Sequence, residues 1–582
     1  MLKICPALRD IDSFFLACTL ILPSIIWSQS NQIQPKGELH GNFQTDIQYY
    51  FRDEAIDPTG EFFPRERLLA AGFANFIYTQ GNFSAGLRYE NYQNNLLGLP
   101  EGFRGEGIPF RFIRFEKDGL ETTVGNFYEQ FGSGMIFRSF EERGLGLDNA
   151  MDGVRLKYRP VKGLYIKGVI GRQRLYFTKA EGIVRGLDAE LNLNEAFSGL
   201  ENSSWLLSVG VSFVSKFQRA ADPVLNLPEN VGATAGRLHL QRGGFGWSTD
   251  FAYKINDPSF DNGFIYRHGT GFISTFTYAT KGLSLMATAK RIDNMSFRSD
   301  RNASLIDAQI NFLPPTTKLH TYTLPALYPN AVQPNGEMGV QFDLSYTIKK
   351  GTPLGGKYGT TISVNYSDIS SIDRQFVSKR PIYSIVNPGE IIDCTWAGTK
   401  GFESNPFRRG PITYFKDLNV EIRKTINRSL KTTFTYYNFV YNQEVLEKGV
   451  TDAEIINRGY EKLVFINAFV LETLYKVRPG HSLRSEIQGM FTRQDRGDWL
   501  MVLAEYSVSP HWFIALQNSW NYGNPNPPER LHYTLGSIGY TLSTTRFQLN
   551  YGRQMRGIFC VGGICRVVPP SNGITLTVTS NF

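Results

Sequence analysis

The chain has 582 residues, a formal net charge of +8 and 42% hydrophobic residues, and its mean hydropathy is only -0.24. Beyond the N-terminus, no stretch approaches the run of about 18 apolar residues that a membrane-spanning helix needs, so a protein built from such helices is excluded. Basic and acidic residues are interspersed without a basic cluster, and the charge gives no reason to expect nucleic-acid binding.

Residues 1–29 have the pattern of a secretory signal peptide. Lys3 and Arg9 supply positive charge, residues 14–27 form an apolar core, and the small residues at 28–30 offer a cleavage site. Cys18 resembles a lipoprotein cysteine only faintly, because the apolar run continues past it. The sequence therefore predicts an exported chain, with a signal peptide at 1–29 and a single domain at 30–582.

Alternation of apolar and polar residues begins with the first mature strand, residues 38–51, where Leu39 and Ile47 share one face and Asp46 lies on the other. The same alternation returns at 83–90, 154–159, 418–423 and 483–491. A soluble sheet shows this pattern where one face is solvated. A transmembrane barrel must repeat it along the whole chain, with the apolar face outward, and the recurrence favours the barrel.

The polar face of these strands carries charges that would line the interior of such a barrel. The residues predicted to face the lumen are Arg88, Arg155, Lys157, Arg159, Arg423, Glu38 and Asp46. A basic lumen would favour anions. Acidic residues on the same face offset that effect, however, and paired structural charges are the alternative interpretation.

The connections between strands are of two kinds. Short ones carry turn residues, as at 79–82, 116–119 and 159–163, and long ones alternate with them, above all 292–337 and 368–414. Short turns at one end and long loops at the other are typical of an outer-membrane barrel. The spacing predicts about 24 strands, with 20 or 22 also compatible. A barrel of this size encloses a wide lumen, which the two longest loops are candidates to fill.

The segment from Gly125 to Gly153 is the most distinctive of the chain. It combines glycines and aromatic residues with the charged residues Arg138, Glu141, Glu142, Arg143 and Asp148. A glycine-rich aromatic segment with paired charges can fold inward and narrow a barrel. We therefore predict a constriction formed by these five residues, with an ordinary outer loop as the alternative.

Three cysteines follow the signal peptide. Cys560 and Cys565 flank a Gly-Gly tip that brings them together, and the oxidising cell envelope predicts a disulfide between them. Cys394 has no predicted role. The seven histidines are scattered singly, and no metal-ligand spacing, nucleophile elbow or phosphate-binding loop occurs. We expect no catalytic residue, no metal site and no cofactor.

The C-terminal strand has an apolar face formed by Ile574, Leu576, Val578 and the terminal Phe582, opposite a face of threonines. This end resembles the C-terminal signal of bacterial outer-membrane proteins, which the barrel-assembly machinery reads. The stretch from Val124 to Tyr158 is similar to a segment of porin-like outer-membrane barrels of Bacteroidetes-type bacteria. That family is functionally uncharacterised, so the resemblance implies a fold and a location but no catalytic residues.

The predicted fold is all-β, a single antiparallel transmembrane β-barrel in the outer membrane of a Gram-negative cell, surrounded by outer-membrane lipid. The segment before the first strand is about seven residues, too short for the folded plug of a TonB-dependent transporter. The first function that we expect is a porin-like channel for small solutes, constricted by inward-folded loops. The second is a non-conducting barrel that assists an envelope complex with an unknown partner. A lipid-acting barrel enzyme ranks last, because no catalytic motif supports it.

Overall fold

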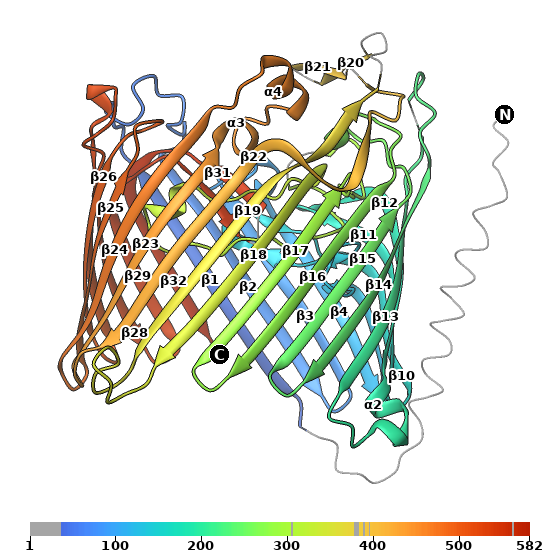
Figure 1. Cartoon of the computed structure of the whole chain (residues 1–582), viewed down its shortest axis with the longest axis horizontal. Coiled ribbons are helices and arrows are strands. Elements are labelled where there is room, and N and C mark those ends of the chain that lie inside the picture. Colours follow the sequence, from blue (N-terminus) through green and yellow to red (C-terminus); the bar gives the residue numbers. More distant parts are fainter. Residues whose placement is uncertain are drawn as a thin grey trace.

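The computed structural model describes residues 36–582, apart from 221, 304–305, 378–382, 388–389, 395 and 562–563. The predicted signal peptide at 1–29 lies outside the described residues. Antiparallel pairing joins 24 strands into one sheet, and the pairing of the first strand with the last closes it. The predicted all-β barrel of about 24 strands is therefore confirmed (Figure 1).

The barrel strands alternate in direction around the sheet. They are β1 (Glu38–Tyr50), β2 (Leu68–Gln80), β3 (Phe83–Gln93), β4 (Gly105–Lys117), β5 (Leu120–Phe127), β10 (Met151–Val161), β11 (Leu164–Leu175), β12 (Thr178–Asn192), β13 (Leu206–Phe217), β14 (Asn230–Arg242), β15 (Phe245–Lys254), β16 (Gly269–Thr280), β17 (Leu283–Asp293), β18 (Gly336–Ile348), β19 (Thr360–Phe376), β22 (Phe402–Thr425), β23 (Leu430–Asn442), β24 (Leu463–Arg478), β25 (His481–Phe491), β26 (Trp499–Val508), β27 (Trp512–Trp520), β28 (His532–Leu542), β29 (Thr545–Gln554) and β32 (Ser571–Asn581).

The remaining elements lie in the connections. Four small hairpins are β6 (Glu129–Gln130) with β7 (Arg138–Ser139), β8 (Glu141–Glu142) with β9 (Leu147–Asp148), β20 (Tyr383–Asn387) with β21 (Glu390–Cys394), and β30 (Gly557–Val561) with β31 (Ile564–Val568). The helices are α2 (Leu193–Ala196), α3 (Gln443–Leu446) and α4 (Asp452–Arg458), and the short 3-10 turns are η2 (Glu101–Phe103), η3 (Arg143–Leu145), η4 (Ser198–Leu200), η5 (Phe260–Asn262), η6 (Pro325–Leu327) and η7 (Pro527–Glu529). Among the described residues, no helix is both long and apolar enough to cross a membrane.

The seam between β1 and β32 shows how the alternating sequence closes the barrel. Ile47 lies opposite Leu576 on the outer face, whereas Asp46 lies opposite Thr577 on the inner face and accepts a 2.7 Å hydrogen bond from its hydroxyl. The backbone N–H of Gly41 donates to the carbonyl of Phe582 over 2.9 Å. A Cβ at position 41 would lie 2.3 Å from the Phe582 ring, so only glycine fits beside the terminal aromatic residue.

The two ends of the barrel differ in their connections. β1 begins and Phe582 lies at the same end of the barrel, which we call the turn end. We call the opposite end the loop end (Figure 1). Most turn-end connections are tight, as predicted, but 193–205 and 349–359 are longer, and the first of these carries α2. Helices α3 and α4 and the hairpin β20–β21 lie at the loop end.

Two loop-end connections fold back into the barrel. We call them plug loop 1 (128–150, between β5 and β10) and plug loop 2 (294–335, between β17 and β18). Their apolar side chains pack with inward-facing wall residues in two clusters, one around Phe137 and Phe297 and one around Leu324 and Tyr328. The other predicted filler, 368–414, is largely strand at its two ends, because 368–376 belong to β19 and 402–414 to β22, and Trp396 between them packs against Phe376.

Candidate functional site

The two plug loops form one body inside the lumen. The backbone N–H of Arg138 donates to the carbonyl of Ile310 over 2.8 Å, and the N–H of Phe312 donates to the carbonyl of Gly134 over 2.9 Å. Phe137 and Ile310 are fully buried in the cluster that joins both loops to the wall. Residues 128–150 of the predicted segment 125–153 thus lie inside the barrel, and the larger part of the plug comes from a second segment more than 140 residues away in the sequence.

A buried group of charges ties plug loop 1 to the barrel wall. We call it the Arg88 cluster: Arg88 and Glu90 of β3, Arg174 of β11, and Glu141 and Asp148 of the plug. Arg88 binds Glu90 at 2.7 Å, Glu141 at 2.8 Å and also Asp148. Arg174 binds Glu90 and Asp148, each at 2.5 Å. The side chains of Arg88, Arg174, Glu90 and Asp148 are each at most 5% exposed.

Burial and ion pairing set the protonation of the plug carboxyls. Burial opposes ionisation of Glu141, but Arg88 and Arg143 outweigh it, and the pKa of Glu141 is lowered from its ordinary value. At Asp148 burial is the larger effect, so its pKa is raised despite Arg174 and Arg88.

The other residues of the predicted constriction have structural contacts. The Arg138 guanidinium lies 4.4 Å from the ring centre of Phe140 and 4.1 Å from that of Phe312. Arg143 binds Glu141 at 2.5 Å. The Glu142 carboxylate accepts only a 3.3 Å hydrogen bond from the N–H of Gly144. Glu141 and Asp148 therefore hold the plug to the wall and Arg138 and Arg143 make contacts within it, whereas Glu142 makes only a local contact.

The charges predicted to face the lumen do so, but they are paired. Arg155 and Lys157 both lie by Glu129 of plug loop 1, at 3.7 and 3.2 Å. The remaining pairs, near the turn end, are Arg159 with Glu195 at 2.9 Å and Arg423 with Glu421 at 2.6 Å, and the exposed Glu38 lies 3.4 Å from the imidazole of His40. This pairing agrees with the structural interpretation of these charges.

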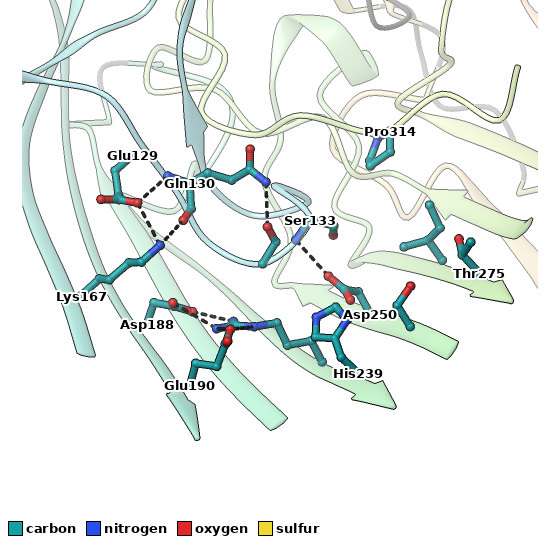
Figure 2. A pocket seen from close by; sticks show the side chains of 14 residues that line it. Glu129, Gln130, Ser133, Lys167, Asp188, Glu190, His239, Asp250, Thr275 and Pro314 are labelled. Carbon is teal, nitrogen blue, oxygen red and sulfur yellow. Dashed lines mark hydrogen bonds and ion pairs between the residues drawn. The ribbon is translucent and has the colours of Figure 1, made fainter. Parts of the chain in front are cut away.

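Beneath plug loop 1, on its turn-end side, lies a cavity of about 540 Å³ (Figure 2). We call it the charged basin: Lys167, Asp188, Glu190, Arg237 and Asp250 of the wall, and Glu129 of the plug. Lys167 donates to Glu129 over 3.0 Å, and Arg237 binds Asp188 at 2.6 Å and Glu190 at 2.8 Å. Sequence reasoning missed the five wall residues, although alternation could have placed them on the inner faces of their strands.

Gly132 allows plug loop 1 to reach the floor of the basin. Its φ of +52° is left-handed, and a Cβ there would lie 3.2 Å from a carboxylate oxygen of Asp250. The next residue, Ser133, donates its backbone N–H to Asp250 over 3.0 Å (Figure 2). A residue with a side chain at position 132 would be strained and would crowd this contact.

Plug loop 2 is attached to the wall by polar contacts of its own. His320 lies 2.9 Å from Asp417 of β22, and the Tyr328 hydroxyl donates to Asp495 over 2.9 Å. Lys290 of β17 binds Glu337 and donates to the carbonyl of Pro314 over 2.6 Å. Within the described part of the chain, no group of histidine, cysteine and acidic side chains is arranged to hold a metal ion.

A second cavity, of about 590 Å³, lies between plug loop 2 and the wall formed by β27, β28, β29, β32 and β1. We call it the neutral chamber. Its polar side chains are Gln48, Thr323, Gln517, Ser537, Gln548, Asn550, Gln554, Ser571 and Thr575, together with Tyr50 and Tyr533. The one charged side chain in its lining, Arg553, is held by both carboxylate oxygens of Asp53, at 2.8 and 3.1 Å. The chamber follows β29 from Gln548 to Gln554, most of the length of that strand.

The hairpin β30–β31 covers the chamber at the loop end. Gly557 and Val568 line the chamber, and the hairpin contacts η6 of plug loop 2 and η3 of plug loop 1. Cys560 lies opposite Cys565 in the hairpin register, and Cys565 is disulfide-bonded. The side chains of Cys560 and Cys394 lie outside the described residues, so the Cys560–Cys565 pairing stays a prediction.

These features define a large β-barrel whose lumen is filled in part by two of its own loops. The chain belongs to a family described as a family of unknown function (DUF6029), whose model matches residues 11–582. No curated protein matches the sequence.

Solved structures with a similar barrel come from several kinds of outer-membrane protein. The P pilus usher (PapC) translocation pore aligns with a TM-score of 0.38 and 9% identity, over 93% of this chain and 99% of that chain. The siderophore receptor PirA from Pseudomonas aeruginosa aligns with a TM-score of 0.40 and 10% identity, over 94% and 81%. OccK11 (OpdR) from Pseudomonas aeruginosa aligns with a TM-score of 0.29 and 9% identity, over 94% and 96%. These similarities concern the barrel fold alone.

Proposed function

We propose that the protein is a porin-like channel in the bacterial outer membrane, constricted by the two plug loops, that passes small polar solutes. The outward face supports a membrane location. Large apolar side chains are exposed on strands all around the barrel, such as Val124 at 54%, Phe251 at 52% and Ile487 at 52%. Soluble proteins rarely expose an apolar surface of this extent, whereas lipid would cover it.

The observation that carries the channel proposal is the position of the neutral chamber. The plug packs against the wall from β2 to β26, and the chamber lies beside plug loop 2 along β27–β32 and β1. Polar side chains line it over most of the height of β29. A chamber of this kind beside a fixed plug would form the permeation route of a slow, size-limited channel.

Planar-bilayer recording of the purified protein tests this proposal. We expect stable steps of low conductance, because the plug leaves only part of the lumen open. A salt gradient should give a small reversal potential, since the chamber carries no unpaired charge. A silent bilayer, from protein that is folded by the gel-shift criterion given in the Discussion, would contradict the channel.

A non-conducting barrel that assists an envelope complex is the second candidate. The Arg88 cluster favours it, because buried ion pairs fix plug loop 1 to the wall at several points. It predicts the silent bilayer and an envelope protein that purifies with the barrel. A lipid-acting enzyme is not proposed.

The remaining proposals concern the route to the membrane. The signal peptide at 1–29 would direct export, and the barrel-assembly machinery would read the apolar edge formed by Ile574, Leu576, Val578 and Phe582. Phe582 lies on the outer face with its ring 5.9 Å from Phe76, where a receptor for this end could reach it before the barrel closes. An origin in Bacteroidetes-type bacteria stays a prediction.

A further inference from the structure

We propose that the neutral chamber is a binding site for small uncharged polyhydroxylated solutes, of the size of a short saccharide. The inference rests on the proposed channel for its biological meaning, because it names the class of solute that the channel would select. The binding itself is independent of conduction and can be measured separately.

Charge is the first argument. The charged basin on the other side of the lumen is lined by six acidic or basic side chains and by His239, but the only acidic or basic side chain in the chamber lining is Arg553. Besides its two bonds to Asp53, Arg553 donates to the carbonyl of His532 over 3.1 Å, so its guanidinium is already occupied. An ionic solute would lose hydration in the chamber without gaining a partner of opposite charge. A neutral solute avoids that cost.

Hydrogen-bonding capacity is the second argument. The side chains of Gln517, Ser537 and Thr575 point into the lumen and have no hydrogen-bond partner among the described residues. Gln548 donates to the side-chain oxygen of Asn550 over 3.1 Å and accepts from Arg546, which lies outside the chamber lining, over 3.1 Å. The amide hydrogens of Asn550 stay available. Amides and hydroxyls both donate and accept, as sugar hydroxyls do. Five such groups on four neighbouring strands can therefore pair with several hydroxyls of one molecule.

Shape and apolar surface are the third argument. The chamber volume of about 590 Å³ lies within the range of roughly 300–1,000 Å³ that is usual for small-molecule sites. Tyr533 and Leu327 give one side an apolar surface, on which the C–H face of a sugar ring can pack. Polar groups on one side and an apolar surface on the other match a saccharide better than a purely polar ion.

Isothermal titration calorimetry of the full chain in detergent, with maltotriose as the probe, tests this inference. Binding should be measurable for the native protein, whereas glutamate at the same concentration should give no binding heat. The variants Gln517→Leu and Gln548→Leu should each weaken maltotriose binding about fivefold, the effect of one lost hydrogen bond. Gln341→Leu is the matched control, because Gln341 also faces the lumen without a side-chain hydrogen bond but lies on β18, away from the chamber.

The results separate this inference from the channel proposal. Absence of maltotriose binding, equal binding of glutamate, or an equal loss in Gln341→Leu would overturn the saccharide site even if the protein conducts. Binding that is lost only in the chamber variants supports the site even if the bilayer is silent. Each variant is first checked for the folded gel mobility, and the isosteric Gln517→Glu provides a second test: its carboxylate should let the chamber bind a polyamine cation such as spermidine, which the native chamber should not bind.

Discussion

At the residue scale, the plug is held by charges that are far apart in the sequence. Arg88 lies 60 residues from Asp148, and Arg174 lies 84 residues from Glu90. Buried pairs of this kind add little to stability when intact, because desolvation offsets their attraction. Removing one partner is costly, however, since a charge is then left buried without compensation. The Arg88 cluster should therefore hold plug loop 1 against the wall, and its loss should release the loop.

Replacement of Arg88 with Met should release plug loop 1. The change removes the cation that the carboxylates of Glu90, Glu141 and Asp148 share, and loss of one partner of a buried ion pair costs about 3 kcal/mol. We expect faster hydrogen exchange in residues 128–150 and larger conductance steps. Glu142→Gln is the control, because Glu142 makes only one hydrogen bond, at 3.3 Å, within plug loop 1. Equal hydrogen-exchange rates in the two variants would show that the Arg88 cluster does not hold plug loop 1 in place.

Acid should weaken the attachment of plug loop 1. Burial raises the pKa of Glu141 and Glu129, but Arg88 at Glu141 and Lys167 at Glu129 outweigh it, so both values fall below the ordinary 4.5. A carboxyl with a lowered pKa stabilises the docked loop above pH 4.5, and this stabilisation is lost as the pH falls through the lowered value. The pKa of Asp148 is raised, so protonation of Asp148 at low pH favours the docked loop and opposes this loss.

Because two of these three carboxyls have a lowered pKa, we expect docking of plug loop 1 to weaken below pH 4.5. Conductance recorded from neutral pH downward should stay constant to about that value and then increase or become noisy. In a Glu141→Gln variant, the acid-induced change should be smaller. A conductance that changes mainly between pH 5 and 7 would show that other groups control the loop.

At the scale of elements, three loop-end connections meet over the lumen: plug loops 1 and 2 and the hairpin β30–β31. The hairpin contacts η3 of one plug loop and η6 of the other, and it covers the neutral chamber. Cys565 is disulfide-bonded, and the predicted pairing with Cys560 would limit how far the two strands of the hairpin can separate. The hairpin is thus placed to regulate access to the chamber from the loop end.

Cys565→Ser should loosen this cover without opening the barrel. We expect single-channel current with more frequent transitions at an unchanged folded mobility, because the hairpin would sample more conformations. If the predicted pairing is right, Cys560→Ser should have the same effect, and the double variant should show no further change. An effect of Cys565→Ser that Cys560→Ser does not share would identify a different partner.

At the scale of the whole molecule, closure is what stabilises the barrel. Each of the 24 strands has two neighbours, so the sheet has no free edge. In a bilayer every backbone N–H and C=O must be paired within the protein, and a closed sheet achieves this. The strand pairing should therefore resist detergent until the protein is heated.

Unboiled protein should migrate differently from boiled protein on a detergent gel, because the closed barrel stays compact and binds less detergent. Replacement of Leu549, in the middle of β29, with Pro should abolish the difference in mobility, because Pro removes a strand-pairing hydrogen bond. Identical mobility of native and boiled protein would argue against a stable closed barrel.

The local pattern of the sequence was enough to predict the barrel. The alternation that places Ile47 outward and Asp46 inward is set by the two-residue period of a strand, and it is visible without any tertiary information. The inward folding of 125–153 was predicted from its glycines and aromatic residues. Residues 294–335 form the rest of the plug. They belong to one of two long connections that were candidates to fill the lumen, because loop length does not tell where a loop folds.

What the sequence by itself determined is therefore the closed sheet, its approximate strand number and the face on which each strand residue lies, since these follow from local periodicity and chain length. Only the tertiary structure decided how the lumen is used. The pairing of Arg88 with Asp148, the contact between the two plug loops and the neutral chamber beside Gln517 and Gln548 all join segments distant in sequence. Such contacts depend on which loops meet inside the barrel, and a strand's period of two carries no information about that.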